Sequence, residues 1–294
     1  MSNSPIVALW NENCEVGLYN CSEYLETLIA YEEDPMTSKR PMLKAPKGNP
    51  LIKTFKHNDE GFALEWSPFN NGIFASGSND KKIYLYRPLS EGFSDWAKDI
   101  SPYVYHSGSV EDLQFSPRDE ALFASCSSDK TLCVVDIRVG NRNQANILIK
   151  AHESDVNVMC WNAINPDLIA TGADDGSFKV WDLRYYKDAE PIFEMEWHTE
   201  PITSIHYQPG QDSVLVVASE DNRISVWDLA MEAEDANEKN DFPDQLLFLH
   251  QGQEEVKEVK FHPKFHDLIA STSASGFNVF KPNVDVEEDE EDLQ

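Results

Sequence analysis

The chain of 294 residues carries 52 acidic residues against 24 basic ones, a formal net charge of −28 at pH 7. This charge disfavours polyanionic partners, and DNA or RNA binding would need clustered Lys and Arg, for which the sequence offers no face. No apolar run approaches the roughly 18 residues of a membrane span, and residues 1–5 do not form the charged start of a secretion signal.

The N-terminal region predicts three strands and one helical turn. Residues 6–11 and 15–20 read as two strands, and residues 51–55 supply a third. Residues 22–29 predict the helical turn. Residues 31–50 hold four prolines and scattered basic residues, which favours a flexible surface loop over a nuclear-localisation signal.

Residues 152–184 form the clearest unit in the chain. They open on His152, continue through an apolar run that ends at Trp161, break at Asp174-Asp175-Gly176 and close on Trp181. Apolar runs at period two, bounded by turn residues, predict antiparallel strands joined by hairpins. The unit therefore predicts a β-meander.

Four more units repeat this pattern, which identifies the chain as a repeat protein. In four units a histidine stands nine residues before an aromatic residue, and in the last unit the aromatic comes two residues later. The histidines are His57, His106, His152, His198 and His250, and the aromatic residues are Trp66, Phe115, Trp161, Tyr207 and Phe261.

These units resemble the WD repeat, in which each copy is one four-stranded blade of a β-propeller. The resemblance implies an all-β fold with about six recognisable blades of a seven-bladed ring. We assign residues 1–282 to the propeller, with a partial first blade at 1–56 and repeats starting at 57, 106, 152, 198 and 250. Residues 283–294 are expected to be a disordered acidic tail. The outer strands are expected at 100–105, 147–150, 192–197 and 246–249.

The family pattern also implies a buried hydrogen-bonded network in each blade. It joins a histidine, a strand-two hydroxyl, a turn aspartate and a strand-three tryptophan, and one unit has all four: His152, Thr171, Asp175 and Trp181. We expect the last blade to lack the network and to be the weakest. Three units depart from this four-residue pattern. The unit that starts at 106 has Val135 in place of the tryptophan, and the unit that starts at 198 has Val217 in place of the hydroxyl. The last unit has Ala274 and Phe280 in place of the turn aspartate and the tryptophan.

The two ends of the repeat array are predicted to be incomplete. The first blade lacks strand one, and the last blade lacks strand four because the acidic tail follows its third strand. A propeller normally closes by lending a strand from one terminus to the other, since an open ring leaves unpaired edges. We therefore expect an N-terminal part to be missing.

Three further segments are distinctive: residues 7–10, residues 60–68, and His250-Gln251-Gly252-Gln253 with Ser275-Gly276-Phe277. They resemble the glutamate-rich WD-repeat subfamily, a ribosome-assembly branch related to the histone-binding retinoblastoma-binding WD proteins. The resemblance implies a monomeric, non-catalytic scaffold of the nucleus and nucleolus, with some in the cytoplasm. It would act as a chaperone for a basic large-subunit ribosomal protein (L-three) and as a histone-binding factor.

The candidate partner site lies where strand one of each blade begins, on the face around the channel. Carboxylates there can accept charge-assisted hydrogen bonds from Arg or Lys, and an aromatic ring can pack against an alkyl stem. The residues that align with histone-tail positions in the histone-binding relatives are Glu60, Phe62, Glu111, Asp155 and Asn157.

Two acidic stretches are candidates for diffuse binding of a cationic client, although such stretches are more often solvated spacers. The first is the insert at 230–244, with Glu232, Glu234 and Asp235. The second is the tail, with Glu287, Glu288, Asp289 and Glu290.

No cofactor, metal site or catalytic group is expected. The five repeat histidines belong to separate blades and cannot converge on one ion, and His262 and His266 favour a surface turn. The five cysteines include no Cys-x-x-Cys pair, which favours reduced thiols in a cytosolic or nuclear protein over disulfides. They are Cys14, Cys21, Cys126, Cys133 and Cys160.

Two alternative functions remain open. Trp181-Asp182-Leu183-Arg184 resembles the box through which substrate receptors bind the adaptor of a cullin-RING ubiquitin ligase, with Arg184 as the contact. A histone-binding subunit of a chromatin complex would use the same surface as the chaperone.

Overall fold

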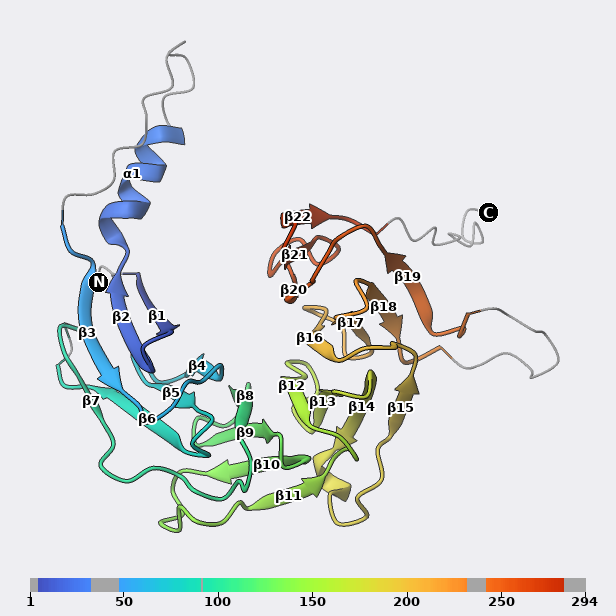
Figure 1. Cartoon of the computed structure of the whole chain (residues 1–294), viewed down its shortest axis with the longest axis horizontal. Helices are drawn as coiled ribbons and strands as arrows, with labels where there is room; N and C mark the ends of the chain where they lie inside the picture. Colours follow the sequence, from blue (N-terminus) through green and yellow to red (C-terminus); the bar gives the residue numbers. More distant parts are fainter. Residues whose placement is uncertain (1–4, 33–47, 91, 232–241, 283–294) are drawn as a thin grey trace, which may run out of the picture.

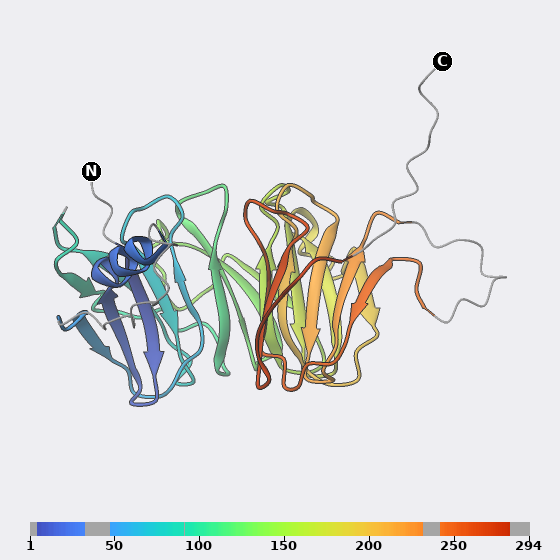
Figure 2. The same cartoon turned by 90° about the horizontal axis from the view of Figure 1, so that it is seen from above.

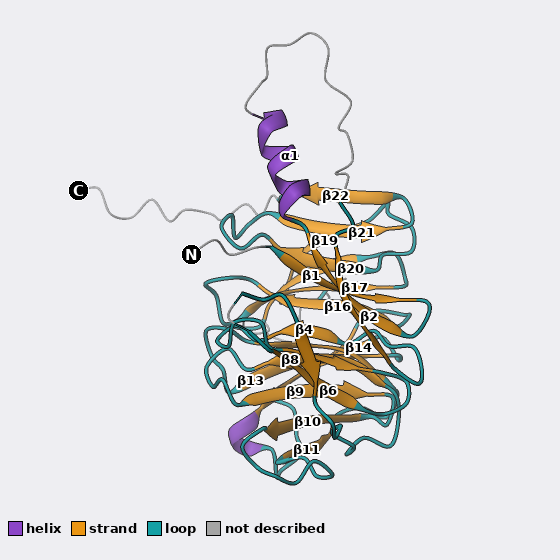
Figure 3. Ribbon diagram, turned by 90° about the vertical axis from the view of Figure 1, so that its left-hand side faces the viewer, coloured by secondary structure: helices purple, strands orange, loops and turns teal. Residues whose placement is uncertain are grey.

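The computed structural model describes residues 5–32, 48–90, 92–231 and 242–282. Over these residues the chain forms six antiparallel sheets, A to F, which follow one another around a central axis in chain order (Figure 1). Each sheet is a meander in which consecutive strands pair, as the alternating apolar runs predict. The strands run across the thickness of a disc, and loops join them at its two faces (Figures 2 and 3).

The first three sheets contain β1 to β11. Sheet A holds β1 (Ile6–Asn11), β2 (Glu15–Asn20) and β3 (Leu51–Lys56), with helix α1 (Ser22–Glu32) between β2 and β3. Sheet B holds β4 (Leu64–Trp66), β5 (Phe74–Gly77), β6 (Ile83–Pro88) and β7 (Trp96–Lys98). Sheet C holds β8 (Val110–Phe115), β9 (Leu122–Ser127), β10 (Thr131–Asp136) and β11 (Ile147–Lys150).

The last three sheets contain β12 to β22. Sheet D holds β12 (Val156–Trp161), β13 (Leu168–Ala173), β14 (Ser177–Asp182) and β15 (Phe193–Glu196), with a short 3₁₀ helix at Leu183–Tyr185. Sheet E holds β16 (Ile202–Tyr207), β17 (Val214–Ser219), β18 (Ile224–Asp228) and β19 (Leu246–His250). Sheet F holds β20 (Glu258–Phe261), β21 (Ile269–Ser273) and β22 (Gly276–Phe280).

The sheets form an open arc of propeller blades, with sheets A and F at its two ends (Figure 1). The predicted all-β propeller with six recognisable blades is thus confirmed. Over the described residues, sheets A and F have three strands each, where the four other sheets have four.

Apolar side chains fill the space between neighbouring sheets. Five buried clusters lie one between each consecutive pair, from A and B to E and F. Two glycines let the sheets approach closely: a Cβ at Gly77 would lie 2.4 Å from Val110 Cγ1, and one at Gly172 would lie 2.5 Å from Ile202 Cγ2. Each blade therefore depends on its neighbour for burial, as expected of a repeat fold.

Two local predictions needed correction. The outer strand of sheet B is β7 (Trp96–Lys98) and not residues 100–105, of which only Tyr103 pairs, through an isolated bridge to Ile83. The Trp96 side chain is fully buried against sheet A, and its indole N–H donates to Gly72 O at 2.7 Å. These contacts place the outer strand earlier in the chain than predicted. The predicted helical turn at 22–29 is a longer helix, α1.

The network predicted for sheet D is present, with one additional member. Trp181 Nε1 donates to Thr171 Oγ1 at 2.9 Å, and that hydroxyl lies 2.8 Å from His152 Nε2. His152 Nδ1 lies 3.0 Å from Ser177 Oγ, which donates to Asp175 Oδ1 at 2.6 Å. Because the Ser177 hydrogen is directed at the carboxylate, we assign the His152 proton to Nδ1, and Nε2 then accepts from Thr171. Burial lowers the pKa of His152 to about 4, so the ring is neutral near pH 7.

Other sheets replace the missing members from different strands. In sheet E, Ser225 Oγ accepts from Trp227 Nε1 at 2.7 Å and lies 2.8 Å from His198 Nε2, so it supplies the hydroxyl that Val217 lacks. In sheet C, Tyr105 OH lies 2.8 Å from Ser125 Oγ, where the pattern has tryptophan.

The prediction that sheet F lacks a network was wrong. Gln253, 5% exposed, accepts hydrogen bonds from Ser271 Oγ at 2.9 Å and Asn278 Nδ2 at 3.0 Å. His250 does not occupy the network position. It ends β19, where its ring stacks on Phe280 with centroids 4.1 Å apart. The glutamine three residues later takes the histidine's place.

Candidate functional site

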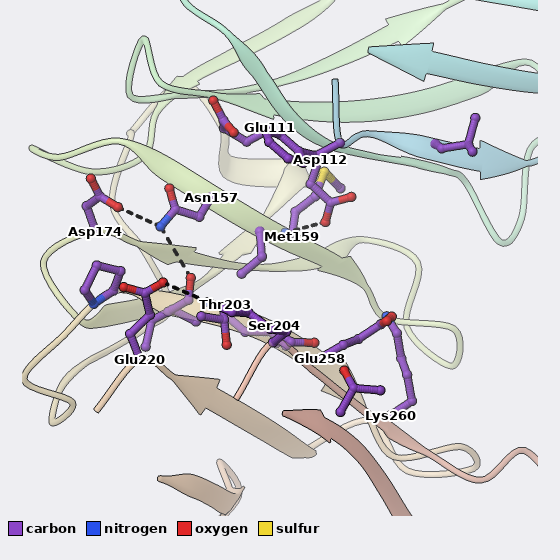
Figure 4. A pocket seen from close by; sticks show the side chains of 18 of the residues that line it. Glu111, Asp112, Asn157, Met159, Asp174, Thr203, Ser204, Glu220, Glu258 and Lys260 are labelled. Carbon is purple, nitrogen blue, oxygen red and sulfur yellow. Dashed lines mark hydrogen bonds and ion pairs between the residues drawn. The ribbon is translucent and has the colours of Figure 1, made fainter. Parts of the chain in front are cut away.

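A cavity of about 740 Å³ lies on the axis of the arc, where the inner strands of sheets B to F face one another (Figure 4). The inner strands are β4, β8, β12, β16 and β20, and each ends in the aromatic residue of its repeat. The residue four positions before that aromatic lines the cavity in all five sheets. This layer consists of Phe62, Glu111, Asn157, Thr203 and Lys257.

The backbone accounts for the direction of three of these side chains. Strand pairing shifts register at Glu111 in β8, Asn157 in β12 and Thr203 in β16. A β-bulge leaves its extra residue unpaired and re-aims the side chain. The preceding residue is fully buried in each case, so the apolar side chain enters the core while the next residue faces the cavity. These buried residues are Val110, Val156 and Ile202.

The lining is strongly acidic. Six carboxylates face two lysines, and each lysine pairs with one of them: Lys257 with Glu220 at 3.6 Å and Lys260 with Glu258 at 3.8 Å. The other four form no ion pair with any described residue. They are Glu65, Glu111, Asp112 and Asp174. The cavity therefore holds unneutralised negative charge available to a cationic ligand.

Two of these carboxylates are held partly protonated by their surroundings. Burial raises the pKa of Asp112 to about 6, although its carboxylate accepts main-chain N–H bonds from Met159 at 3.0 Å and Leu113 at 2.8 Å. Burial, and then the charge of Asp112, raises the pKa of Glu65 to about 7. The charge of Asp112 thus opposes the ionisation of Glu65 on the neighbouring inner strand, and a bound cation would favour the ionised form of both.

One hydrogen bond orders the rim of the cavity. Asn157 Nδ2 donates to Asp174 Oδ1 at 2.8 Å and approaches Ile202 O at 3.4 Å, which ties the turn after β13 to the start of β16 (Figure 4). Phe62 stands at the same level and is 69% exposed.

The structure brings three of the five predicted partner-site residues together and places two elsewhere. Phe62, Glu111 and Asn157 line the cavity. Glu60 and Asp155 lie outside it, and their carbonyl oxygens accept main-chain hydrogen bonds from Asn79 and Asp174 at 2.8 and 3.0 Å. The acidic residues predicted at 232–235 and 287–290 lie outside the described residues.

Sequence reasoning missed most of the cavity charge. The fixed offset from the terminal aromatic residue would have found Thr203 and Lys257. No pattern within a single strand signals that Glu65, Asp112 and Lys260 converge from three sheets.

The candidate ligase contact lies at the opposite end of sheet D from Asn157, because successive strands alternate in direction. Arg184 Nε and Nη2 donate to the two oxygens of Asp182 at 2.9 and 2.5 Å, and the Arg184 side chain remains 59% exposed. Arg138 pairs with Asp136 in the same way in sheet C. Arg184 also borders a cavity of about 260 Å³ between sheets C and D, whose apolar lining is Leu122, Val134, Ile147, Trp161, Pro166 and Leu183.

Neither a metal site nor a membrane span was found in the described part of the chain. It contains no group of three or more His, Cys, Asp or Glu side chains arranged to hold an ion. Its helices are too short or too polar to cross a bilayer.

Comparison with known proteins establishes the class. Four stretches match the WD domain, G-beta repeat: residues 49–87, 99–136, 144–182 and 189–228. Together with the blade geometry, this match shows that the chain belongs to the WD-repeat family.

Three relatives narrow the resemblance to the expected subfamily. Ribosome assembly protein rrb1 of Schizosaccharomyces pombe is 37% identical over 95% of this chain and 58% of its own length. Glutamate-rich WD repeat-containing protein 1 of Dictyostelium discoideum is 39% identical over 95% of this chain and 56% of its own length. Histone acetyltransferase type B subunit 2 of Debaryomyces hansenii is 27% identical over 67% of this chain and 48% of its own length. The chain thus spans less than two thirds of each relative.

Proposed function

We propose that this chain is a non-catalytic chaperone or assembly scaffold that binds cationic proteins in its acidic central cavity. The observation that carries the proposal is the excess of carboxylates over lysines in the lining, in a chain of net charge −28. A newly made ribosomal protein or histone is strongly basic, and an acidic surface both masks that charge and speeds encounter.

The proposed clients are a basic large-subunit ribosomal protein, L-three, and histones. The names of two relatives support these classes, one a ribosome assembly protein and the other a subunit of a histone acetyltransferase. A protein that binds such clients would act in the nucleus and nucleolus, and part of it would be found in the cytoplasm. The same surface would serve a histone-binding subunit of a chromatin complex.

Salt dependence tests this proposal. Raising NaCl from about 50 to about 300 mM should weaken binding to purified histones or to the ribosomal protein about tenfold or more, because surface charges are screened. Calorimetric titration at several salt concentrations measures the effect. Binding that is absent, or that does not change with salt, would contradict an electrostatic capture site.

A second candidate function is favoured by Arg184, which is exposed beside an apolar cavity far from the central one. In this reading the chain is a substrate receptor of a cullin-RING ubiquitin ligase. Pull-down with the ligase adaptor should then fail for Arg184→Ala and succeed for Arg138→Ala, which removes an equivalent Arg–Asp pair. Because the Asp182 side chain is only 5% exposed and would lose its cation, Arg184→Ala should lower the free energy of unfolding, and circular dichroism checks that both variants are folded before the pull-down. Equal recovery of both variants would exclude Arg184 as the contact.

A further inference from the structure

Lys260 lies in a second layer of residues around the central axis, one position before the terminal aromatic residue of each inner strand. The residues at this position are Glu65, Gln114, Cys160, His206 and Lys260. Burial, and then the charge of Lys260, lowers the pKa of His206 to about 3, so the ring is neutral near pH 7. Glu65 is therefore the one acid of this layer, and Lys260 is its one cation.

The Lys260 side chain is held only loosely by its own strand. Lys260 Nζ lies 3.8 Å from Glu258 Oε1, and the two side chains are 51% and 59% exposed (Figure 4). An ion pair as long and as exposed as this one stabilises little. Lys260 forms no other ion pair with a described residue. The ammonium group is therefore not fixed by a close partner.

The charge of Lys260 acts on the two buried acids of the cavity. Burial raises the pKa of Asp112 and of Glu65, and in both cases the charge of Lys260 opposes the rise. The two acids belong to sheets C and B and Lys260 to sheet F, so the ammonium acts across the axis. The other lysine of the lining, Lys257, pairs with Glu220 instead. A client cation that approaches Asp112 and Glu65 would therefore meet a resident positive charge.

We propose that Lys260 is a built-in competitor for cationic clients. Its ammonium offsets part of the charge of Glu65 and Asp112, and a Lys or Arg side chain of the client displaces it. The displaced ammonium turns toward Glu258, because the lysine stem is flexible. The inference rests on the proposed function for its client and adds a requirement for that client. A cluster of cations can displace the resident charge, whereas a single cation gains little from the exchange.

Calorimetric titration with purified histones measures the effect of removing the competitor. Lys260→Gln keeps a polar side chain and should bind histones about fivefold more tightly, because a like charge no longer opposes the client's cations. Lys260→Arg keeps the charge and should stay within about twofold of the wild type. The matched control is Lys264→Gln, which removes the same charge from an exposed loop of sheet F and should bind less than about twofold more tightly. A Lys260→Gln variant that binds no more tightly than Lys264→Gln would overturn the proposal.

A measurement without a client separates this inference from the proposed function. At about pH 8 Glu65 and Asp112 are ionised and attract Lys260, so Lys260→Gln should lower the urea midpoint of unfolding. At about pH 4 both acids are protonated, and the midpoint should be nearly unchanged. An equal shift at both pH values would contradict the placement of the ammonium near these acids. If the shift depends on pH as expected but the wild type binds no histone, the proposed function is wrong and the competitor has no client.

Discussion

Replacing Thr171 with valine should lower the free energy of unfolding by about 3 kcal/mol. The Thr171 hydroxyl accepts from Trp181 Nε1 and bonds His152 Nε2, and all three residues are buried. Valine has nearly the same shape, so the change removes the hydroxyl and leaves one donor and one acceptor without partners inside sheet D. Each buried polar group left unpaired costs about 1–3 kcal/mol.

Urea denaturation measures this loss, with an unchanged slope showing that the unfolded state is not affected. The matched control is Thr272→Val, the same substitution on β21 at an exposed position, which should change stability by less than about 0.5 kcal/mol. A loss at Thr171 as small as that of the control would show that the network does not stabilise the blade.

At about pH 8, the Glu65→Gln variant should be more stable than the wild type by about 2 kcal/mol, while at about pH 4 the two should be equal. Burial raises the pKa of Glu65 in the folded chain from 4.5 to about 7. Below 4.5 the group is protonated in both the folded and the unfolded chain, so it contributes nothing. As pH rises from 4.5 to 7, the unfolded chain releases its proton first, and the wild type loses stability that the glutamine variant keeps. Partial exposure of the side chain makes the effect smaller than the full shift implies.

Chemical denaturation of both proteins at several pH values measures this difference. The control is Glu120→Gln, which removes an exposed carboxylate from a loop of sheet C. It should change the free energy of unfolding only slightly, and by the same amount at every pH. A constant difference between Glu65→Gln and the wild type across this range would contradict the raised pKa. Since a bound cation favours the ionised form, client binding should also strengthen as pH rises through 6 to 7.

The sequence predicted the strands best where a short apolar run is bounded by polar or turn residues. β1, β2 and β11 have the predicted bounds, because each is such a run. The outer strand of sheet B was misplaced because burial of Trp96 against sheet A, a contact between repeats, overrides the local pattern at 100–105.

The networks were predictable in kind but not in every member. Ser177 and Ser225 lie on the third strand of their sheets, and only the pairing register places their hydroxyls beside His152 and His198. Gln253 shows the same limit, because a pattern that requires histidine cannot find the glutamine that replaces it. The candidate site was found in part: the repeat offset leads to Glu111 and Asn157, while the acids that converge from different sheets become visible only in three dimensions.

The most direct test of the cavity as the client site compares two triple variants that remove the same charge. One neutralises the cavity rim with Glu111→Gln, Asp174→Asn and Glu220→Gln, and the other neutralises exposed loop acids with Glu120→Gln, Asp188→Asn and Glu190→Gln. Titration with purified histones should show about tenfold weaker binding for the first variant and less than about twofold for the second, because only the cavity carboxylates converge on one ligand. Equal weakening in both variants would mean that clients are held by net charge alone and not by the cavity.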